Sequence, residues 1–200
     1  MPRPPRIEYP NAIHHVAMRG NRRLPVFEGR ADFEVYLETL SKVTARQGWR
    51  LLSYCLMPNH LHLLIQTPAP NLSEGMGLLS GTYTRMYNDV RGVPGHVFQG
   101  RFKNQLVESD EHLLTAFAYI ALNPVKPGFC GSPIDWEWSA HRELCGSPPL
   151  ASARIVAADA LACFGEDPEA ARRRYVRFVR SYADMVAVGD KVESVYREPF

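Results

Sequence analysis

The 200-residue sequence lacks several features that define large classes of proteins. No apolar run approaches the ~20 residues that a transmembrane helix needs, and the opening segment MPRPPRIEYP contains no apolar signal core. The four cysteines are scattered and form no C-x-x-C pair, which excludes a dense disulfide framework and a zinc knuckle. We therefore expect a cytoplasmic protein with reduced thiols and no membrane partner.

The total charge is nearly balanced, at +2, and by itself favours no class of partner. The distribution of charge is uneven, because arginines gather in three segments: the first 30 residues, residues 85–103 and residues 172–180. A surface run of arginines is often only a solvated face. Three such groups in one small chain favour a partner that bears phosphate groups.

The apolar pattern alternates between a period of two and a helical period along most of the chain. It predicts the order strand, helix, strand, hairpin turn, strand, helix, strand, helix, with the turn at Pro58-Asn59. This order is typical of a ferredoxin-like α+β sandwich, an antiparallel sheet with helices on one face. We expect this domain to occupy residues 1–148, and an arginine-rich, helical C-terminal appendage to occupy residues 149–200.

Two histidines, His60 and His62, interrupt an apolar strand in the segment SYCLMPNHLHLLIQTPAP. Alternate residues of a strand point to the same face, so the two imidazoles are expected side by side. A buried polar group without a partner is costly. The two rings must therefore either take hydrogen bonds from the rest of the fold or share a metal ion, and the His-x-His pattern alone leaves both interpretations open.

The segment DEHLLTAFAYIALN is predicted to be a mostly apolar helix that stops before Pro124. Its polar residues follow spacings of three and four and so form one stripe; they are His112, Thr115, Tyr119 and Asn123. Asparagine offers a neutral oxygen ligand and tyrosine a nucleophilic phenol. If this stripe lies over the two histidines, the site combines two nitrogens, one amide oxygen and one hydroxyl.

The segments CLMPNHLHLLIQTP, RGNRR, GHVFQGRFK and YIALNPVKPG together resemble the single-tyrosine HUH transposases, and particularly the REP-associated tyrosine transposases of bacteria. The resemblance covers about residues 9 to 145, so the domain of residues 1–148 would be the transposase or nuclease domain. It implies that His60 and His62 hold a divalent metal, Mg²⁺ or Mn²⁺, with Asn123 as third ligand. It also implies that Tyr119 cleaves single-stranded DNA and forms a 5′-phosphotyrosine, beside hairpins of repetitive palindromic elements.

The basic residues around the turn RGNRR and after GHVFQG are expected to hold the backbone of a folded DNA strand. They are Arg19, Asn21, Arg22, Arg23, Arg101 and Lys103. The expected partner is single-stranded DNA with a hairpin, the expected location is the cytoplasm in association with the nucleoid, and monomer and dimer remain open. We expect a structural role for His15, and packing or base stacking for Tyr83 and Tyr87.

Two other interpretations compete with a tyrosine nuclease. The first is a non-catalytic nucleic-acid binder that retains the fold. The second is a zinc hydrolase that uses His60 and His62 with Cys55 or an acidic residue; no acid lies near the motif in sequence, which argues against this interpretation. The base that would deprotonate Tyr119 is not apparent, although His112 shares its stripe.

Overall fold

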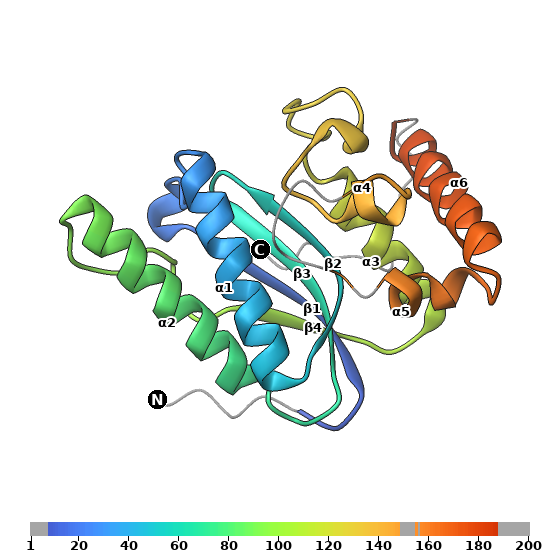
Figure 1. Ribbon diagram of the computed structural model, residues 1–200. Coiled ribbons are helices and arrows are strands. Elements are labelled where there is room, and N and C mark those ends of the chain that lie inside the picture. The colour runs from blue at the N-terminus through green and yellow to red at the C-terminus, as the bar shows by residue number, and fades with distance from the viewer. Residues whose placement is uncertain (1–7, 149–154, 156, 188–200) are drawn as a thin grey trace.

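The computed structural model describes residues 8–148, 155 and 157–187. Four antiparallel strands form one sheet in the order β2-β3-β1-β4 (Figure 1). Their bounds are β1 Ala12–Arg19, β2 Arg50–Met57, β3 His60–Thr67 and β4 Lys103–Val107. The predicted hairpin turn at residues 58 and 59 is confirmed, since β2 ends and β3 begins on either side of it.

Three long helices cover this sheet: α1 (Arg30–Gln47), α2 (Leu72–Arg91) and α3 (Asp110–Leu122). α1 ends at Gly48, which has the left-handed backbone (φ 67°) that glycine adopts readily. α3 begins at Ser109, whose side chain accepts the N–H of His112 as an N-cap. The order of strands and helices is as predicted.

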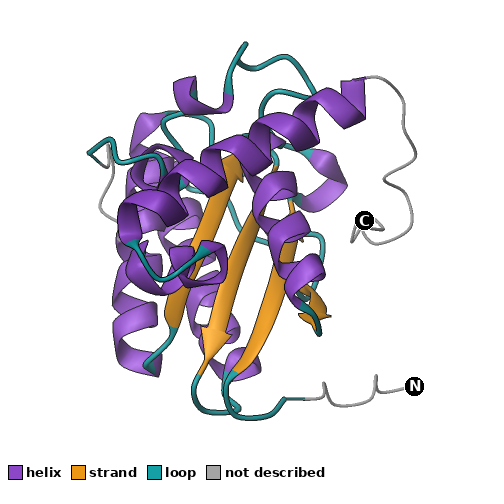
Figure 2. Ribbon diagram, turned by 90° about the vertical axis from the view of Figure 1, so that its right-hand side faces the viewer, coloured by secondary structure: helices purple, strands orange, loops and turns teal. Residues whose placement is uncertain are grey.

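The predicted fold class is confirmed, but the helices do not all lie on one face of the sheet. α1 and α2 pack on one face, whereas α3 covers the other (Figure 1), and from that side helices cross in front of the strands (Figure 2). Strand periodicity identifies residues that share a face, but it does not say which helix covers that face. The central strand β3 is buried on both faces, as expected of a strand between two layers of helices.

The C-terminal appendage is helical, as predicted, and packs against α3. It contains α5 (Ala157–Leu161) and α6 (Pro168–Ala187), and α4 (His141–Leu144) precedes it. The ring of Phe117 on α3 contacts those of Phe164 and Tyr175, with centroids 5.7 and 6.1 Å apart. The predicted domain boundary falls at residues 149–154, outside the described residues, and stays a prediction.

None of the described helices combines the length and the apolar character that a membrane span requires. The hydrophobic core is continuous, and it includes buried residues of the sheet, the three long helices and the appendage.

Two glycines of α2 provide a matched test of this packing. A Cβ at Gly75 would lie 2.1 Å from Cζ2 of Trp49, whose indole N–H is held by Asn71 Oδ1 at 2.7 Å, whereas a Cβ at Gly81 would meet nothing within 4 Å. Gly75→Ala should therefore lower the free energy of unfolding by about 1–3 kcal/mol through overpacking. Gly81→Ala should raise it by up to about 1 kcal/mol, because alanine favours a helix. Urea denaturation measures both, and effects of the same sign would contradict the packing of α2.

Candidate functional site

The structure brings together the four residues that were predicted to carry chemistry. His60 and His62 lie on β3, and their ring centroids are 5.3 Å apart at an angle of 85°. Asn123, which directly follows α3, places its Oδ1 2.8 Å from Nε2 of His60. The ring of Tyr119 on α3 meets that of His62 edge to face, with centroids 5.3 Å apart. The polar stripe of α3 therefore lies over the histidine face of the sheet, while the chemical roles of these residues stay predictions.

His15 on β1 fixes the orientation of His62. Nε2 of His15 lies 3.0 Å from Nδ1 of His62, and both rings are fully buried. Burial lowers the pKa of His15 to about 3. Burial also lowers the pKa of His62 well below its ordinary value, and the charges of His15, His60, Arg19 and Lys126 lower it further. Both imidazoles are therefore neutral at pH 7, and in the tautomer that donates from Nδ1, Nε2 of His62 carries the lone pair that a metal needs.

The surroundings of His60 fit a metal ligand. Its Nδ1 lies 2.8 Å from Oδ1 of Asn59, and its Nε2 lies 2.8 Å from Oδ1 of Asn123. A neutral imidazole donates from only one of its two nitrogens, so it cannot donate to both oxygens. Two adjacent ligands of an octahedral cation, each about 2.1 Å from the metal, lie about 3 Å apart. Without a metal, the Asn123 amide would have to be rotated so that its Nδ2 donates to Nε2 of His60.

The ligands that a zinc hydrolase would require are not present in the described part of the chain. No group of three or more His, Cys, Asp or Glu side chains is placed there to hold a metal ion. Cys55 pairs with His62 in the sheet register, but burial raises the pKa of its thiol, which disfavours the thiolate that zinc binds. The candidate ligands are therefore two imidazoles and one amide.

Lys126 is a candidate functional residue that the sequence analysis missed. It lies in the turn after α3, where its backbone N–H donates to the carbonyl of Leu122. Its Nζ lies 4.7 Å from the ring centroid of Tyr119, a cation–π geometry. The available signal was the lysine in NPVKPG, which follows the Tyr-x-x-x-Asn motif directly.

Tyr83, Tyr87 and His112 do not lie in the candidate site. Tyr83 is buried and its hydroxyl donates to the carbonyl of Val26, while the hydroxyl of Tyr87 donates to Glu28. Both therefore tie α2 to the segment before α1, which confirms the expected packing. His112 lies two turns before Tyr119 on α3, about 10 Å along the axis, which is too far for a base.

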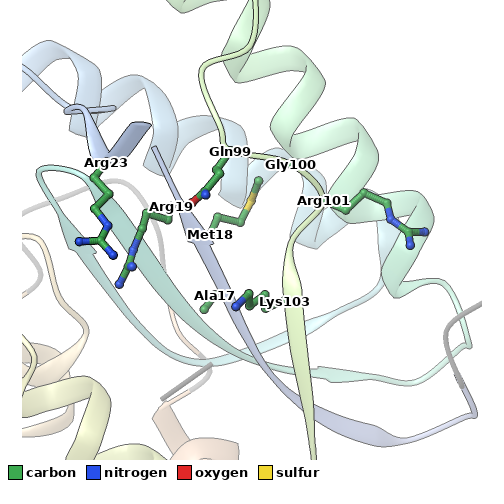
Figure 3. A pocket seen from close by; sticks show the side chains of 8 residues that line it. All are labelled: Ala17, Met18, Arg19, Arg23, Gln99, Gly100, Arg101 and Lys103. Atoms are coloured by element: carbon green, nitrogen blue, oxygen red, sulfur yellow. The ribbon is translucent and has the colours of Figure 1, made fainter. Parts of the chain in front are cut away.

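A basic cavity of about 400 Å³ opens beside β1 and β4 (Figure 3). Half of its lining residues are cations and none is an acid; the lining is Ala17, Met18, Arg19, Arg23, Gln99, Gly100, Arg101 and Lys103. Arg19 and Arg23 lie side by side in Figure 3, and Arg101 extends on the other side. Because Arg19 pairs with His60 across the two strands, the cavity adjoins the histidine pair.

The turn that carries these arginines is tightly built. Arg22 and Arg23 both have left-handed backbones, with φ of 54° and 62°, which cost about 1–2 kcal/mol each for residues with a Cβ. The Asn59 side chain donates to the carbonyl of Arg23 at 3.2 Å, and a Cβ at Gly20 would lie 2.0 Å from the carbonyl oxygen of Leu24. Of the predicted DNA-binding residues, four line the cavity, whereas Asn21 and Arg22 lie exposed on the same turn.

A second cavity, of about 570 Å³, is lined by residues of α2 and of the segment 96–101. The two share Met18, Gly100 and Arg101, and the second adds Arg85 and His96 at its margin. The two cavities therefore adjoin where Met18, Gly100 and Arg101 lie.

Comparison with known proteins gives three matches. The family model described as IS200-like transposase matches residues 8–123, more than half of the chain. A putative REP-associated tyrosine transposase of Haemophilus influenzae is 30% identical over 105 residues, which cover 46% of this chain and only 60% of that relative. A solved structure described as a REP-associated tyrosine transposase bound to a REP hairpin matches with a TM-score of 0.61, over 78% of this chain and 93% of that chain, at 20% identity. This last match confirms the fold, and the family match identifies the chain as a member of the IS200-like transposase family.

Proposed function

We propose that this protein is a metal-dependent single-stranded DNA endonuclease and strand transferase that acts at hairpins of repetitive palindromic elements. The observation that carries the proposal is the position of Tyr119 and Asn123 over His60 and His62. Membership of a transposase family supports DNA as the substrate. The similarity to REP-associated transposases, one of them described as bound to a REP hairpin, supports the choice of hairpin.

The basic cavity is suited to hold the DNA backbone next to the reacting residues. Arg19, Arg23 and Lys103 line it together with Arg101, whose side chain extends away from the other three (Figure 3). Guanidinium groups bind phosphate oxygens in a bidentate manner. Such contacts position a strand without reading its sequence. A strand held there passes His60, because Arg19 and His60 are register partners.

His60, His62 and Asn123 would hold a divalent cation, Mg²⁺ or Mn²⁺. These ligands are neutral, and imidazole somewhat favours Mn²⁺ over Mg²⁺. When bound, such a cation neutralises charge on a non-bridging phosphate oxygen and so eases nucleophilic attack. The protein's own part is to orient the ligands: His15 fixes the ring of His62, and Asn59 contacts the far side of the ring of His60.

Tyr119 supplies the nucleophile. Its phenolic oxygen loses its proton and forms a bond to the scissile phosphorus, the bond from phosphorus to the 3′ oxygen breaks, and the released 3′ oxygen takes up a proton to become a hydroxyl. The ammonium of Lys126 lies 4.7 Å from the ring centroid and holds the ring by a cation–π contact. The phosphodiester is replaced by a phosphotyrosine of similar energy, so a 3′-hydroxyl can reverse the step and join strands without another energy source.

Replacing the nucleophile tests the reaction. Wild-type protein with Mn²⁺ and a labelled single-stranded DNA carrying a hairpin should give an adduct that survives a denaturing gel and maps to a peptide containing Tyr119. Tyr119→Phe should fold and bind the same DNA but form no adduct, because only the hydroxyl is lost. Tyr83→Phe is the matched control and should still form the adduct. An adduct formed by Tyr119→Phe would refute the assignment, and hairpin binding by wild type without any adduct would favour a non-catalytic binder.

Metal binding is tested separately from cleavage by calorimetric titration with Mn²⁺. His62→Ala and His60→Ala should lose measurable binding, whereas Asn123→Ala should weaken it less, because water can replace one neutral ligand. His15→Ala should weaken it about 10- to 100-fold, as expected when the partner that orients a ligand is removed. The exposed His96 provides the control, and equal affinities in His62→Ala and His96→Ala would exclude this ligand set.

The contribution of the basic cavity appears in the salt dependence of DNA binding. Neutralising Arg19 and Arg23 with glutamine should weaken binding by similar factors for unrelated sequences. It should also reduce the slope of log affinity against log salt by about 0.7–0.9 for each lost phosphate contact. Arg46→Gln, an exposed change on α1, should leave the slope unaltered. An unchanged slope in the Arg19 and Arg23 variant would mean that these residues are only solvated.

A further inference from the structure

The arginine cluster of α6 divides into two groups with different surroundings. Arg172 pairs with Glu169 at 3.0 Å, and Arg174 donates to the carbonyl of Phe164 at 2.9 Å, so these two stabilise the appendage. The other three, Arg173, Arg177 and Arg180, are exposed. Among the described residues, none of these three takes part in an ion pair or a hydrogen bond. The contacts that stabilise the appendage therefore explain Arg172 and Arg174 but not the three exposed arginines.

The three exposed arginines form a straight line, which we call the arginine ridge. Their spacings of four and three residues place them on one face of the helix. That face is opposite the stripe that α6 buries, which consists of Ala171, Tyr175, Val179 and Tyr182. α6 is the outermost helix on its side of the molecule, so the ridge faces outward (Figure 1). Two acids lie on the same face: Glu169, which pairs with Arg172, one turn before Arg173, and Asp184, one turn beyond Arg180.

One end of the ridge approaches the candidate active site. Arg180 and Leu122 line a common cavity of about 230 Å³ between the end of α3 and α6. Leu122 directly precedes Asn123, so the ridge begins next to the turn that carries the proposed ligand and Lys126. It then extends about 10 Å along α6 to Arg173.

We propose that Arg173, Arg177 and Arg180 bind the backbone of the duplex stem of a DNA hairpin whose unpaired flank lies at Tyr119; this inference rests on the proposed function. Over about 10 Å, one strand of B-form DNA carries about three phosphates, which matches the three guanidinium groups. A rigid line of charges on a helix suits a rigid duplex backbone better than a flexible single strand. All three residues are arginine, whose planar guanidinium binds phosphate in a bidentate manner. The ridge also lies outside residues 8–123, so it adds a surface that the family match does not include.

The test uses two DNA molecules. One is a hairpin with a stem of about one helical turn and a single-stranded flank, and the other is the same flank without the stem. Sequence is unimportant for the stem, because phosphate contacts do not read bases. The variant Arg173→Gln, Arg177→Gln should bind the hairpin about 10-fold more weakly, with a salt slope reduced by about 0.9 for each lost contact. Its binding to the stemless flank, and its adduct formation on that flank, should equal those of wild type. The control variant Lys42→Gln, Arg46→Gln removes the same charge from exposed positions on α1, and it should change neither hairpin binding nor flank binding. The variant Arg173→Lys, Arg177→Lys should restore most of the hairpin binding.

Three results would overturn the inference. Hairpin binding equal to wild type in the glutamine variant would make the ridge a solvated face. An equal loss of affinity for the hairpin and for the stemless flank would mean that the ridge binds single strands or acts only through its overall charge. Ridge-dependent binding to phosphatidylserine vesicles without an effect on the hairpin would assign it to a membrane. Failure of the proposed function is distinguishable, since wild type would then form no adduct on the flank while hairpin affinity still reports on the ridge.

Discussion

The candidate site depends on the packing of one apolar helix, α3, across the face of β3 that carries His60 and His62. Burial of the apolar residues of α3 holds the helix in place, and this also buries Tyr119 and Asn123, which are only 4% and 7% exposed. Buried polar groups need partners in a medium of low dielectric constant. The burial that forms the core therefore also places the Asn123 amide against His60 and the Tyr119 ring against His62.

The C-terminal appendage supports this arrangement from the other side of α3. Phe117 packs against Phe164 and Tyr175, and the hydroxyl of Tyr175 lies 2.7 Å from Nδ1 of His141. α3 is thus enclosed between the sheet and α6, and its last turn cannot shift without disturbing both layers. A nucleophile and a ligand placed on a rigid, enclosed helix are better positioned than they would be on a loop. The appendage therefore contributes to the site even where it supplies no reacting group.

Local sequence patterns predicted the strands and helices, the hairpin, and the facing pair of His60 and His62, because these depend on spacings of two to four residues. The stripe of Tyr119 and Asn123 was predictable for the same reason. The contact of His15 with His62 was not, because it depends on the register of β1 against β3 across 47 residues. The position of Lys126 over the ring of Tyr119 depends on the shape of a turn. The placement of α3 on the face opposite α1 and α2 depends on how the loops connect the strands and helices, which the periodicity of the sequence does not describe.

The charges around the site explain why it stays open to an anion. Burial lowers the pKa of His62, and the charges of His15, His60, Arg19 and Lys126 lower it further, which favours the neutral imidazole. Two carboxylates near the start of α1 are engaged by residues of α2: Asp32 binds Arg91 at 2.7 Å, and Glu28 accepts the hydroxyl of Tyr87. A carboxylate lying inside the cavity would compete with phosphate for Arg19, and the lining contains none. The lining therefore combines four cations with no acid, and a cavity lined in this way suits an anion such as phosphate.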